Sequence, residues 1–440
     1  MVDDGPAAAA VWRSDPSPLQ LACGVQHYDW GERGPDALIP RLFGASPAAT
    51  PDAPYAELWI GAHPALPATV ALPGADATMT LMELITRAPQ EALGAASVER
   101  FGPELPFLAK VLTAERPLSI QAHPDRAQAQ AGFAREDAAG IPRDAPGRSY
   151  RDRNHKPELI LALGEFFALK GFRPVAEIAA LFATVPELAA LAAGPPPRVA
   201  TDAPDRAPER EWLRRLFERC MSPDDGQAER ALVALVDRLE RQAGTGGAPV
   251  PPPMRDEPAY WLVRTARRLA RGGPPDRGLF AFYLLNLVHL RAGEALFLRA
   301  GEPHAYLEGR GLEVMANSDN VLRGGLTPKH VDLGELLRVL MFDGEPALPV
   351  RPDPTGRYPA PVQEFAARMV ALGPGGAPAD LAAGSATVLL VLEGAAVLEA
   401  GAHQVAIARG EAWFVPAAIA SCRLRASSES ARVFAVTVPT

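Results

Sequence analysis

The stretch LPFLAKVLTAERPLSIQAHPD (105–125) holds two short apolar runs separated by a polar turn. The runs LPFLAKVL (105–112) and PLSIQAH (117–123) are rich in residues that suit strands, so we expect them to pair as a hairpin. PELILALGEFFALKGF (157–172) predicts a second strand pair that turns near Gly164. Short strands separated by turns at this spacing favour a β-sandwich or jelly roll.

The chain changes character twice after this β-rich part. Residues 174–277 carry apolar residues at helical spacing, interrupted by Pro/Gly linkers, and predict an inserted helical domain. GLFAFYLLNLVHL (278–290) predicts one more helix, and VLLVLEGAAVLEAGAHQVAIARGEAWFVPA (388–417) has the rhythm of strands joined by glycine turns. We therefore expect a mainly β chain with an α insert, divided into a first β-domain, its insert, the completion of that domain and a C-terminal β-sandwich, over residues 1–173, 174–277, 278–344 and 345–440.

Size and composition narrow the possible functions. A chain of 440 residues with 48% hydrophobic residues exceeds one ordinary core, so two or three domains are expected. A net charge of −8 argues against sequence-independent binding of nucleic acid, which needs a basic surface. Three distant cysteines offer neither a disulfide framework nor a CxxC metal site. The sequence shows no signal peptide and no apolar run near the roughly 20 residues of a membrane span, so we expect a cytoplasmic protein without a membrane partner.

Four side chains have the composition of a metal site. Ser119, Gln121 and His123 alternate along a strand and should share one face. Glu158 opens an apolar strand and His304 follows a Gly-Glu-Pro turn, so each also suits a structural role in an ion pair or a turn hydrogen bond. Together with Gln121 and His123 they form a nitrogen and oxygen set that suits zinc, iron, nickel or cobalt. Such a set carries one negative charge, so a divalent ion would keep a net positive charge to act on a substrate.

Basic residues suggest an anionic ligand. Arg323 and Lys329 lie among turn-forming residues of LEVMANSDNVLRGGLTPKHVD (312–332), which also holds Glu313. Arginine binds phosphate bidentately and lysine binds it as a point charge, although surface charges in loops are also common without a ligand. Lys110 interrupts an apolar strand, so it must either reach water or meet an anion.

Read together, these segments resemble the type I mannose-6-phosphate isomerases (phosphomannose isomerases) of the cupin superfamily. The similarity runs in the family's order from residue 19 to about residue 342. It rests on VQHYDWG (25–31), YAELWIGAHP (55–64), LPFLAKVL (105–112), PLSIQAHPD (117–125), NHKPEL (154–159), FFALKGFRP (166–174), GEPHAYLEG (301–309) and MANSDNVLRGGLTPKHVD (315–332). The resemblance implies two cupin-like jelly-roll β-sandwiches with a helical domain inserted in the first.

The resemblance also implies roles for individual residues. It implies one Zn²⁺ per chain, held by Gln121, His123, Glu158 and His304. It implies an essential arginine at Arg323 and residues that hold the substrate phosphate at Ser119, Lys110 and Lys329. It implies candidates for proton transfer, or for orienting the group that performs it, at Lys156, His155 and Glu313.

The reaction implied by the resemblance interconverts mannose 6-phosphate and fructose 6-phosphate through a cis-enediol. We expect the sugar phosphate to be the only partner and the protein to be a monomer. Two other readings are consistent with the residues. His123, Glu158 and His304 could form the two-histidine, one-carboxylate triad of an iron oxygenase. A non-catalytic cupin that binds sugar phosphates is the second, although it would be expected to lack a ligand or the arginine.

Overall fold

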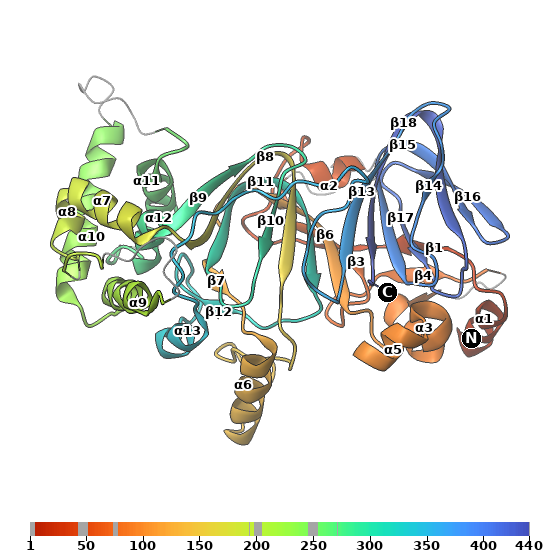
Figure 1. Ribbon diagram of the computed structural model, residues 1–440, viewed down its shortest axis with the longest axis horizontal. Coiled ribbons are helices and arrows are strands. Elements are labelled where there is room, and N and C mark those ends of the chain that lie inside the picture. Colours follow the sequence, from red (N-terminus) through yellow and green to blue (C-terminus); the bar gives the residue numbers. More distant parts are fainter. Residues whose placement is uncertain are drawn as a thin grey trace.

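Figure 1 shows the computed structural model, in which a helical part at one end of the long axis adjoins two β-sheets. The structure describes residues 5–42, 52–73, 78–192, 194–197, 205–244, 254–270 and 272–439. Within these residues each sheet has nine strands, and the strands pair in antiparallel fashion. The prediction of a mainly β chain with two β-sheet units and an α insert is confirmed.

The first sheet runs in the order β10-β8-β11-β6-β3-β2, with β7, β9 and β12 paired at its side. Its strands are β2 (Gly24–Gln26), β3 (Glu57–Gly61), β6 (Phe107–Ala114), β7 (Gln121–Ala122), β8 (Glu158–Phe172), β9 (Leu285–Leu290), β10 (Ala295–Leu298), β11 (His304–Ala316) and β12 (Leu322–Arg323). Every residue of β6 is buried, because the strand lies inside the sheet with both faces covered. This burial explains the almost continuous apolar run of β6 and makes Lys110 within it exceptional.

The second sheet runs in the order β13-β18-β15-β17-β1-β4-β5, with β14 and β16 at its side. Its strands are β1 (Leu19–Ala22), β4 (Thr69–Ala71), β5 (Thr78–Thr80), β13 (Ala366–Leu372), β14 (Ala379–Asp380), β15 (Thr387–Ala400), β16 (His403–Ala408), β17 (Ala412–Val415) and β18 (Cys422–Thr437). β1 pairs with β17, with Leu19 opposite Phe414. One hydrophobic core joins the two sheets, since Val111 and Leu161 of the first cluster with Phe414 and Val436 of the second.

The insert between β8 and β9 is helical, as expected. It contains α7 (Val175–Thr184), α8 (Pro186–Ala189), α9 (Ala207–Met221), α10 (Gly226–Gly244) and α11 (Pro258–Leu269). In α9 the buried residues Trp212, Leu216 and Cys220 recur every four positions and give the helix one apolar face toward the shared helical core. The other helices are α1 (Gly5–Ser14), α2 (Leu38–Leu42), α3 (Leu81–Arg87), α4 (Pro89–Leu93), α5 (Ala95–Phe101), α6 (Arg126–Ala138), α12 (Ala281–Leu284) and α13 (Leu333–Val339).

Three local predictions are wrong. Residues 105–123 form no hairpin, because β6 pairs with β3 and β11 whereas β7 pairs with β11 and β12. Residues 157–172 form one long strand that passes Gly164 without reversing, since β11 pairs along both halves of it. Residues 278–290 contain the end of a 3-10 turn (Arg277–Phe280), the short helix α12 and then β9, which pairs with β8. Leu285 of β9 packs in the core shared with the helical insert, whereas Val288 and Leu290 pack with residues of the first sheet. A short apolar run does not by itself distinguish a buried helix from a buried strand.

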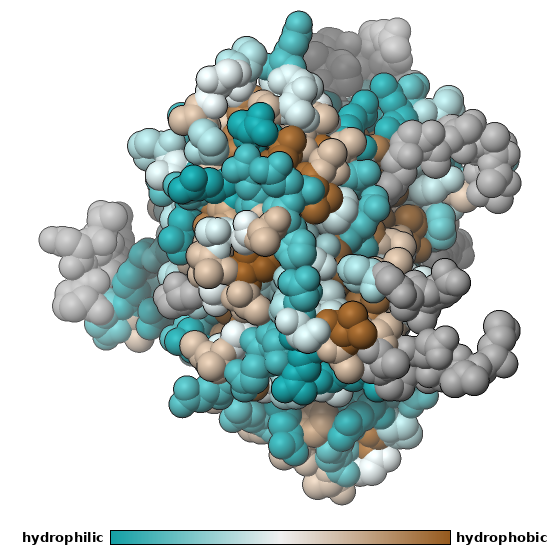
Figure 2. Space-filling view, turned by 90° about the vertical axis from the view of Figure 1, so that its right-hand side faces the viewer, coloured by the Kyte–Doolittle hydropathy of each residue, from teal (hydrophilic) through white to brown (hydrophobic). Residues whose placement is uncertain are grey.

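The end of the molecule formed by the second sheet has a surface of mixed hydropathy (Figure 2). Figure 2 shows this end of the molecule, where hydrophobic residues occur in small groups among hydrophilic ones. None of the helices within the described ranges is both long and apolar enough to cross a bilayer.

We propose that the domain boundaries lie where the sequence predicts them, at 173/174, 277/278 and 344/345. The N-terminal segment has one further role that the sequence did not predict. Residues 1–173 supply β1, β4 and β5 to the second sheet, so the N-terminal segment takes part in both sheets.

Candidate metal centre and active site

Three buried side chains converge at strand ends of the first sheet. His123 directly follows β7, Glu158 is the first residue of β8, and His304 is the first residue of β11. Their nitrogen and oxygen atoms of the ligand type all lie within 4.8 Å of one another, and none of the three residues is more than 3% exposed. The structure therefore brings together three of the four residues predicted to bind a metal.

Backbone carbonyls fix the orientation of both histidines. Nδ1 of His123 donates to the carbonyl of Asn320 at 2.7 Å, and Nδ1 of His304 donates to the carbonyl of Glu302 at 3.0 Å. Each Nε2 then faces the Glu158 carboxylate, at 3.3 Å from His123 and 3.4 Å from His304. Burial lowers the pKa of His123 to about 4, so its ring is neutral near pH 7 and Nε2 presents a lone pair.

A cation fits this arrangement. The Nε2 atom of His123 is buried without a hydrogen-bond partner among the described residues. A lone pair beside a carboxylate oxygen is electrostatically unfavourable unless a positive charge lies between them. Two imidazole nitrogens held by second hydrogen bonds to carbonyls, with one carboxylate, form the donor set that zinc binds in proteins.

Gln121 lies in the same site. Its backbone stands opposite His304 on β11 and opposite Arg323 on β12, so the three residues form one row across adjacent strands. Directly opposed residues of antiparallel strands point to the same face of the sheet. Gln121 and His304 accordingly line one cavity, together with Glu57, Lys110, Leu118, Lys156, Glu158, Tyr306 and Glu313.

Lys156 and His155 point to different cavities. Lys156 is buried, and its Nζ lies 3.4 Å from Oε1 of Glu158. His155 lines a separate cavity, where its Nε2 lies 2.7 Å from Oε1 of Glu364. Arg126 donates to the same carboxylate oxygen at 2.7 Å. Adjacent residues of an extended segment point to opposite sides, so only one of the two lies beside the metal-ligand group.

Lys110 meets anions rather than water. Its Nζ lies 2.9 Å from Oε2 of Glu313 and 3.6 Å from Oε2 of Glu57. Burial alone would lower the pKa of Lys110, but the carboxylates of Glu313 and Glu57 raise it, so the ammonium stays charged. Tyr306 donates from its hydroxyl to Oε1 of Glu313 at 2.9 Å, and Trp59 donates to Glu57 at 2.7 Å.

Removing this buried cation should destabilise the fold. We expect Lys110→Met to lower the free energy of unfolding by about 3–5 kcal/mol, because it leaves the carboxylates of Glu313 and Glu57 buried without their cation. Urea unfolding measures the change. The double variant Lys110→Met, Glu313→Gln should recover part of the loss, since it removes one unpaired charge. An unchanged unfolding midpoint for Lys110→Met would contradict the expectation.

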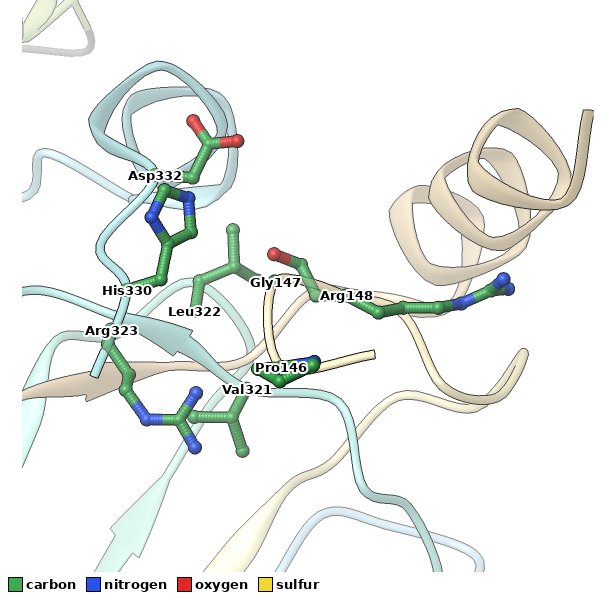
Figure 3. Close-up of a pocket in the computed structure, with 9 residues that line it drawn as sticks. Pro146, Gly147, Arg148, Val321, Leu322, Arg323, His330 and Asp332 are labelled. Atoms are coloured by element: carbon green, nitrogen blue, oxygen red, sulfur yellow. The ribbon is translucent and has the colours of Figure 1, made fainter. Parts of the chain in front are cut away.

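Two further cations, Arg151 and Lys329, lie close to Arg323. Figure 3 shows Arg323 of the edge strand β12 in the lining of a cavity that also includes Pro146, Val321 and His330. Burial and then the neighbouring Arg151 lower the pKa of Arg323. Lys329 is exposed, and burial of part of it, then Arg323 and Arg151, lower its pKa as well. Because Arg151, Arg323 and Lys329 repel one another, an anion bound near them would be stabilised.

Ser119 lies in the loop between β6 and β7. It is half-buried between Leu118, whose N–H donates to the carbonyl of Tyr306, and Ile120, whose N–H donates to the carbonyl of Gly325. The first bond holds the chain next to β11, and the second holds it next to the loop that follows β12.

The sequence did not single out several residues that shape the site. Glu57 and Tyr306 complete the charge cluster around Lys110, Glu364 holds His155, and Asn320 orients His123. Glu57 and Asn320 lie inside segments of family resemblance, YAELWIGAHP and MANSDN, but nothing in their local pattern separates them from ordinary strand and turn residues.

Comparisons with known proteins point to one family. Residues 19–175 match the family model described as phosphomannose isomerase type I, catalytic domain. Mannose-6-phosphate isomerase of Escherichia coli (strain K12) is 39% identical over 420 residues, which cover 94% of this chain and 99% of that protein. Mannose-6-phosphate isomerase 1 of Arabidopsis thaliana is 34% identical over 419 residues, covering 93% of this chain and 91% of that protein.

Solved structures give the same result. A crystal structure of a mutant phosphomannose isomerase from Salmonella typhimurium has a TM-score of 0.79 and 35% identity, covering 96% of this chain and 100% of that chain. A zinc-bound holo structure of mannose 6-phosphate isomerase has a TM-score of 0.78 and 36% identity, with the same coverage. Similarity at this level extends over both sheets and the helical insert. The chain belongs to the type I mannose-6-phosphate isomerase family.

Proposed function

We propose that this protein is a zinc-dependent isomerase that interconverts mannose 6-phosphate and fructose 6-phosphate through a cis-enediol. The observation that carries the proposal is the convergence of His123, Glu158 and His304, with both Nε2 atoms facing one carboxylate inside a buried cavity. Membership of the family supports the substrate and the reaction, and the relatives include a zinc-bound structure.

We assign zinc binding to Gln121, His123, Glu158 and His304, one ion per chain. The four ligands together carry one negative charge, from Glu158. A divalent ion held by them would therefore supply net positive charge next to the oxygens on which negative charge develops when a proton leaves the carbon beside a carbonyl. Arg323 stands in the row of Gln121 and His304, and we assign it to add positive charge at the same place.

We assign proton transfer between C1 and C2 to Nζ of Lys156. This atom lies 3.4 Å from Glu158 at the wall of the cavity, which puts a compact, rotatable ammonium or amine within reach of a bound sugar. His155 was the second candidate from sequence. Because its Nε2 bonds Glu364 in another cavity, we assign it to hold the segment that carries Lys156.

We assign the substrate phosphate to Lys329 and Ser119, with Arg323 at the border between the phosphate and the reacting carbons. Lys110 was a further candidate, but its ammonium already has two carboxylate partners. Its role in the proposal is therefore to fix Glu313 at the cavity wall. Phosphate binding far from C1 and C2 would orient these carbons for proton transfer.

Loss of the exposed phosphate ligand should weaken substrate binding selectively. We expect Lys329→Ala to raise KM for mannose 6-phosphate about tenfold, which corresponds to about 1.4 kcal/mol, and to change kcat less. Lys329→Arg keeps the charge and should stay close to the unmodified protein. Unphosphorylated mannose should be converted equally poorly by all three proteins. An unchanged KM in Lys329→Ala steady-state kinetics would remove Lys329 from the phosphate site.

The proposed function is tested with the purified zinc-loaded protein. We expect it to convert mannose 6-phosphate to fructose 6-phosphate, measured by a coupled assay, at the same rate with and without oxygen. Failure to form fructose 6-phosphate would refute the proposal. Turnover that requires oxygen would support an iron oxygenase instead, and phosphate-ester binding without turnover would support a non-catalytic binding protein.

A further inference from the structure

Asn320 is a fully buried residue in the loop between β11 and β12, and among the described residues its side-chain amide bonds a single segment, residues 151–154. Its Oδ1 accepts from the N–H groups of Arg151 at 2.7 Å and Asp152 at 3.1 Å. Its Nδ2 donates to the carbonyls of Asp152 at 3.0 Å and Asn154 at 2.8 Å, and to Oδ1 of Asp152 at 3.2 Å. These five hydrogen bonds cross 166–169 positions of sequence to residues 151–154.

The backbone of the same residue holds a metal-ligand histidine. The carbonyl of Asn320 accepts from Nδ1 of His123 at 2.7 Å, which leaves Nε2 of His123 directed at Glu158. Residues 151–154 lead directly into Lys156 and Glu158. Asn320 therefore contacts both sides of the site, one through its carbonyl and the other through its amide.

The segment held by Asn320 has no regular structure of its own. Residues 151–157 belong to no helix or strand, so its backbone groups need partners from elsewhere. Asn320 supplies partners for two of its N–H groups and two of its carbonyls. Asp152 strengthens the contact from the opposite side, since its carboxylate accepts from Ser318 Oγ at 2.9 Å and from the N–H of Asp319 at 2.7 Å.

We propose that Asn320 is a positioning residue of the metal site, fixing His123 through its carbonyl and the segment that carries Lys156 and Glu158 through its amide. The inference rests on the proposed function, because it assumes that these residues serve zinc binding and proton transfer. Only asparagine meets both demands of its amide at this size, since one atom accepts from N–H groups while the other donates to oxygens. In Asn320→Asp a carboxylate oxygen would face the three oxygens that Nδ2 now bonds.

The test measures zinc affinity by titrating a chromophoric chelator against the zinc-loaded full-length protein. We expect Asn320→Asp to bind zinc about 10–100-fold more weakly, as is typical when the partner that orients a metal ligand is disturbed. With zinc saturating, kcat should still fall, because the segment that carries Lys156 is displaced.

Asn286→Asp is the matched control. Asn286 is also a buried asparagine, and its Nδ2 donates to the carbonyls of Lys170, Gly171, Phe172 and Glu345. This variant should lose thermal stability as Asn320→Asp does and keep the zinc affinity of the unmodified protein. Equal zinc affinity in Asn320→Asp and Asn286→Asp would overturn the inference.

A second variant decides the question if Asn320→Asp does not fold. Asp152→Ala leaves Asn320 in place and removes the carboxylate that its Nδ2 and Ser318 bond, so a smaller fall in zinc affinity is expected. An unchanged affinity in a folded Asp152→Ala protein would then overturn the inference. Absence of zinc binding by the unmodified protein would instead refute the proposed function, so the two failures are distinct.

Discussion

Replacement of Glu158 by Gln is expected to remove stoichiometric zinc and to lower kcat/KM for mannose 6-phosphate at least about 1,000-fold, or about 4 kcal/mol of transition-state stabilisation. Glu158 is the one carboxylate of the ligand group, and both histidine Nε2 atoms face it. Gln keeps the shape of the side chain but removes the charge that holds a cation between these nitrogens. Elemental analysis and steady-state kinetics on the same samples measure both effects.

Thermal unfolding separates loss of zinc from general damage. Zinc at about 100 times its Kd should stabilise the unmodified protein by about 2.7 kcal/mol, whereas Glu158→Gln should gain nothing at that concentration. Glu165→Gln is the matched control, because Glu165 lies on the same strand with an exposed side chain that pairs with His289 and Arg255. A Glu158→Gln protein with stoichiometric zinc and unchanged kcat/KM would refute the assignment of the ligand group.

The helices of the insert follow from local pattern, whereas the pairing of the strands does not. Apolar residues at helical spacing correctly predicted the insert, because one face of α9 or α10 must reach a core. The partner of a strand depends instead on contacts far along the chain. β1 pairs with β17 almost 400 residues later, and no feature of LQLA in β1 specifies that neighbour. The expected hairpin of residues 105–123 failed for the same reason.

In the candidate site, too, the sequence suggested which residue types take part but not the contacts that they make. Chemical type suggested His123, Glu158 and His304, together with Gln121, as a metal-ligand group, while a structural role stayed open for Glu158 and His304. The direction of His155 could not be read from NHKPEL, because Glu364 lies 209 positions away. Lys110 left two outcomes open, and the carboxylates of Glu57 and Glu313 decided between them only through sheet pairing.

Replacement of Lys156 is expected to have the second large effect. We expect Lys156→Met to lower kcat about 10²–10⁴-fold, the usual contribution of a positioned acid or base, while stoichiometric zinc is retained. Zinc should remain, because the Lys156 ammonium, 3.4 Å from Glu158, is a cation and is not itself one of the assigned zinc ligands. Exchange of the C1 and C2 hydrogens with deuterated solvent should slow in parallel with kcat, since the proposed defect is in proton transfer itself.

Lys156→Arg makes the prediction specific to the amine. The chain has only four lysines among its 44 lysine and arginine residues. If position 156 needed nothing more than a positive charge, arginine, which is the usual cation of this chain, would serve there as well. Arginine does not release its proton near neutral pH and needs more room than the buried Lys156 occupies, so it should not restore activity. Arg153→Met, an exposed cation of the same segment whose guanidinium lies over Phe133, should keep kcat within about threefold. If Lys156→Arg keeps more than about a tenth of kcat, Lys156 serves as a fixed charge and the proton moves through another group.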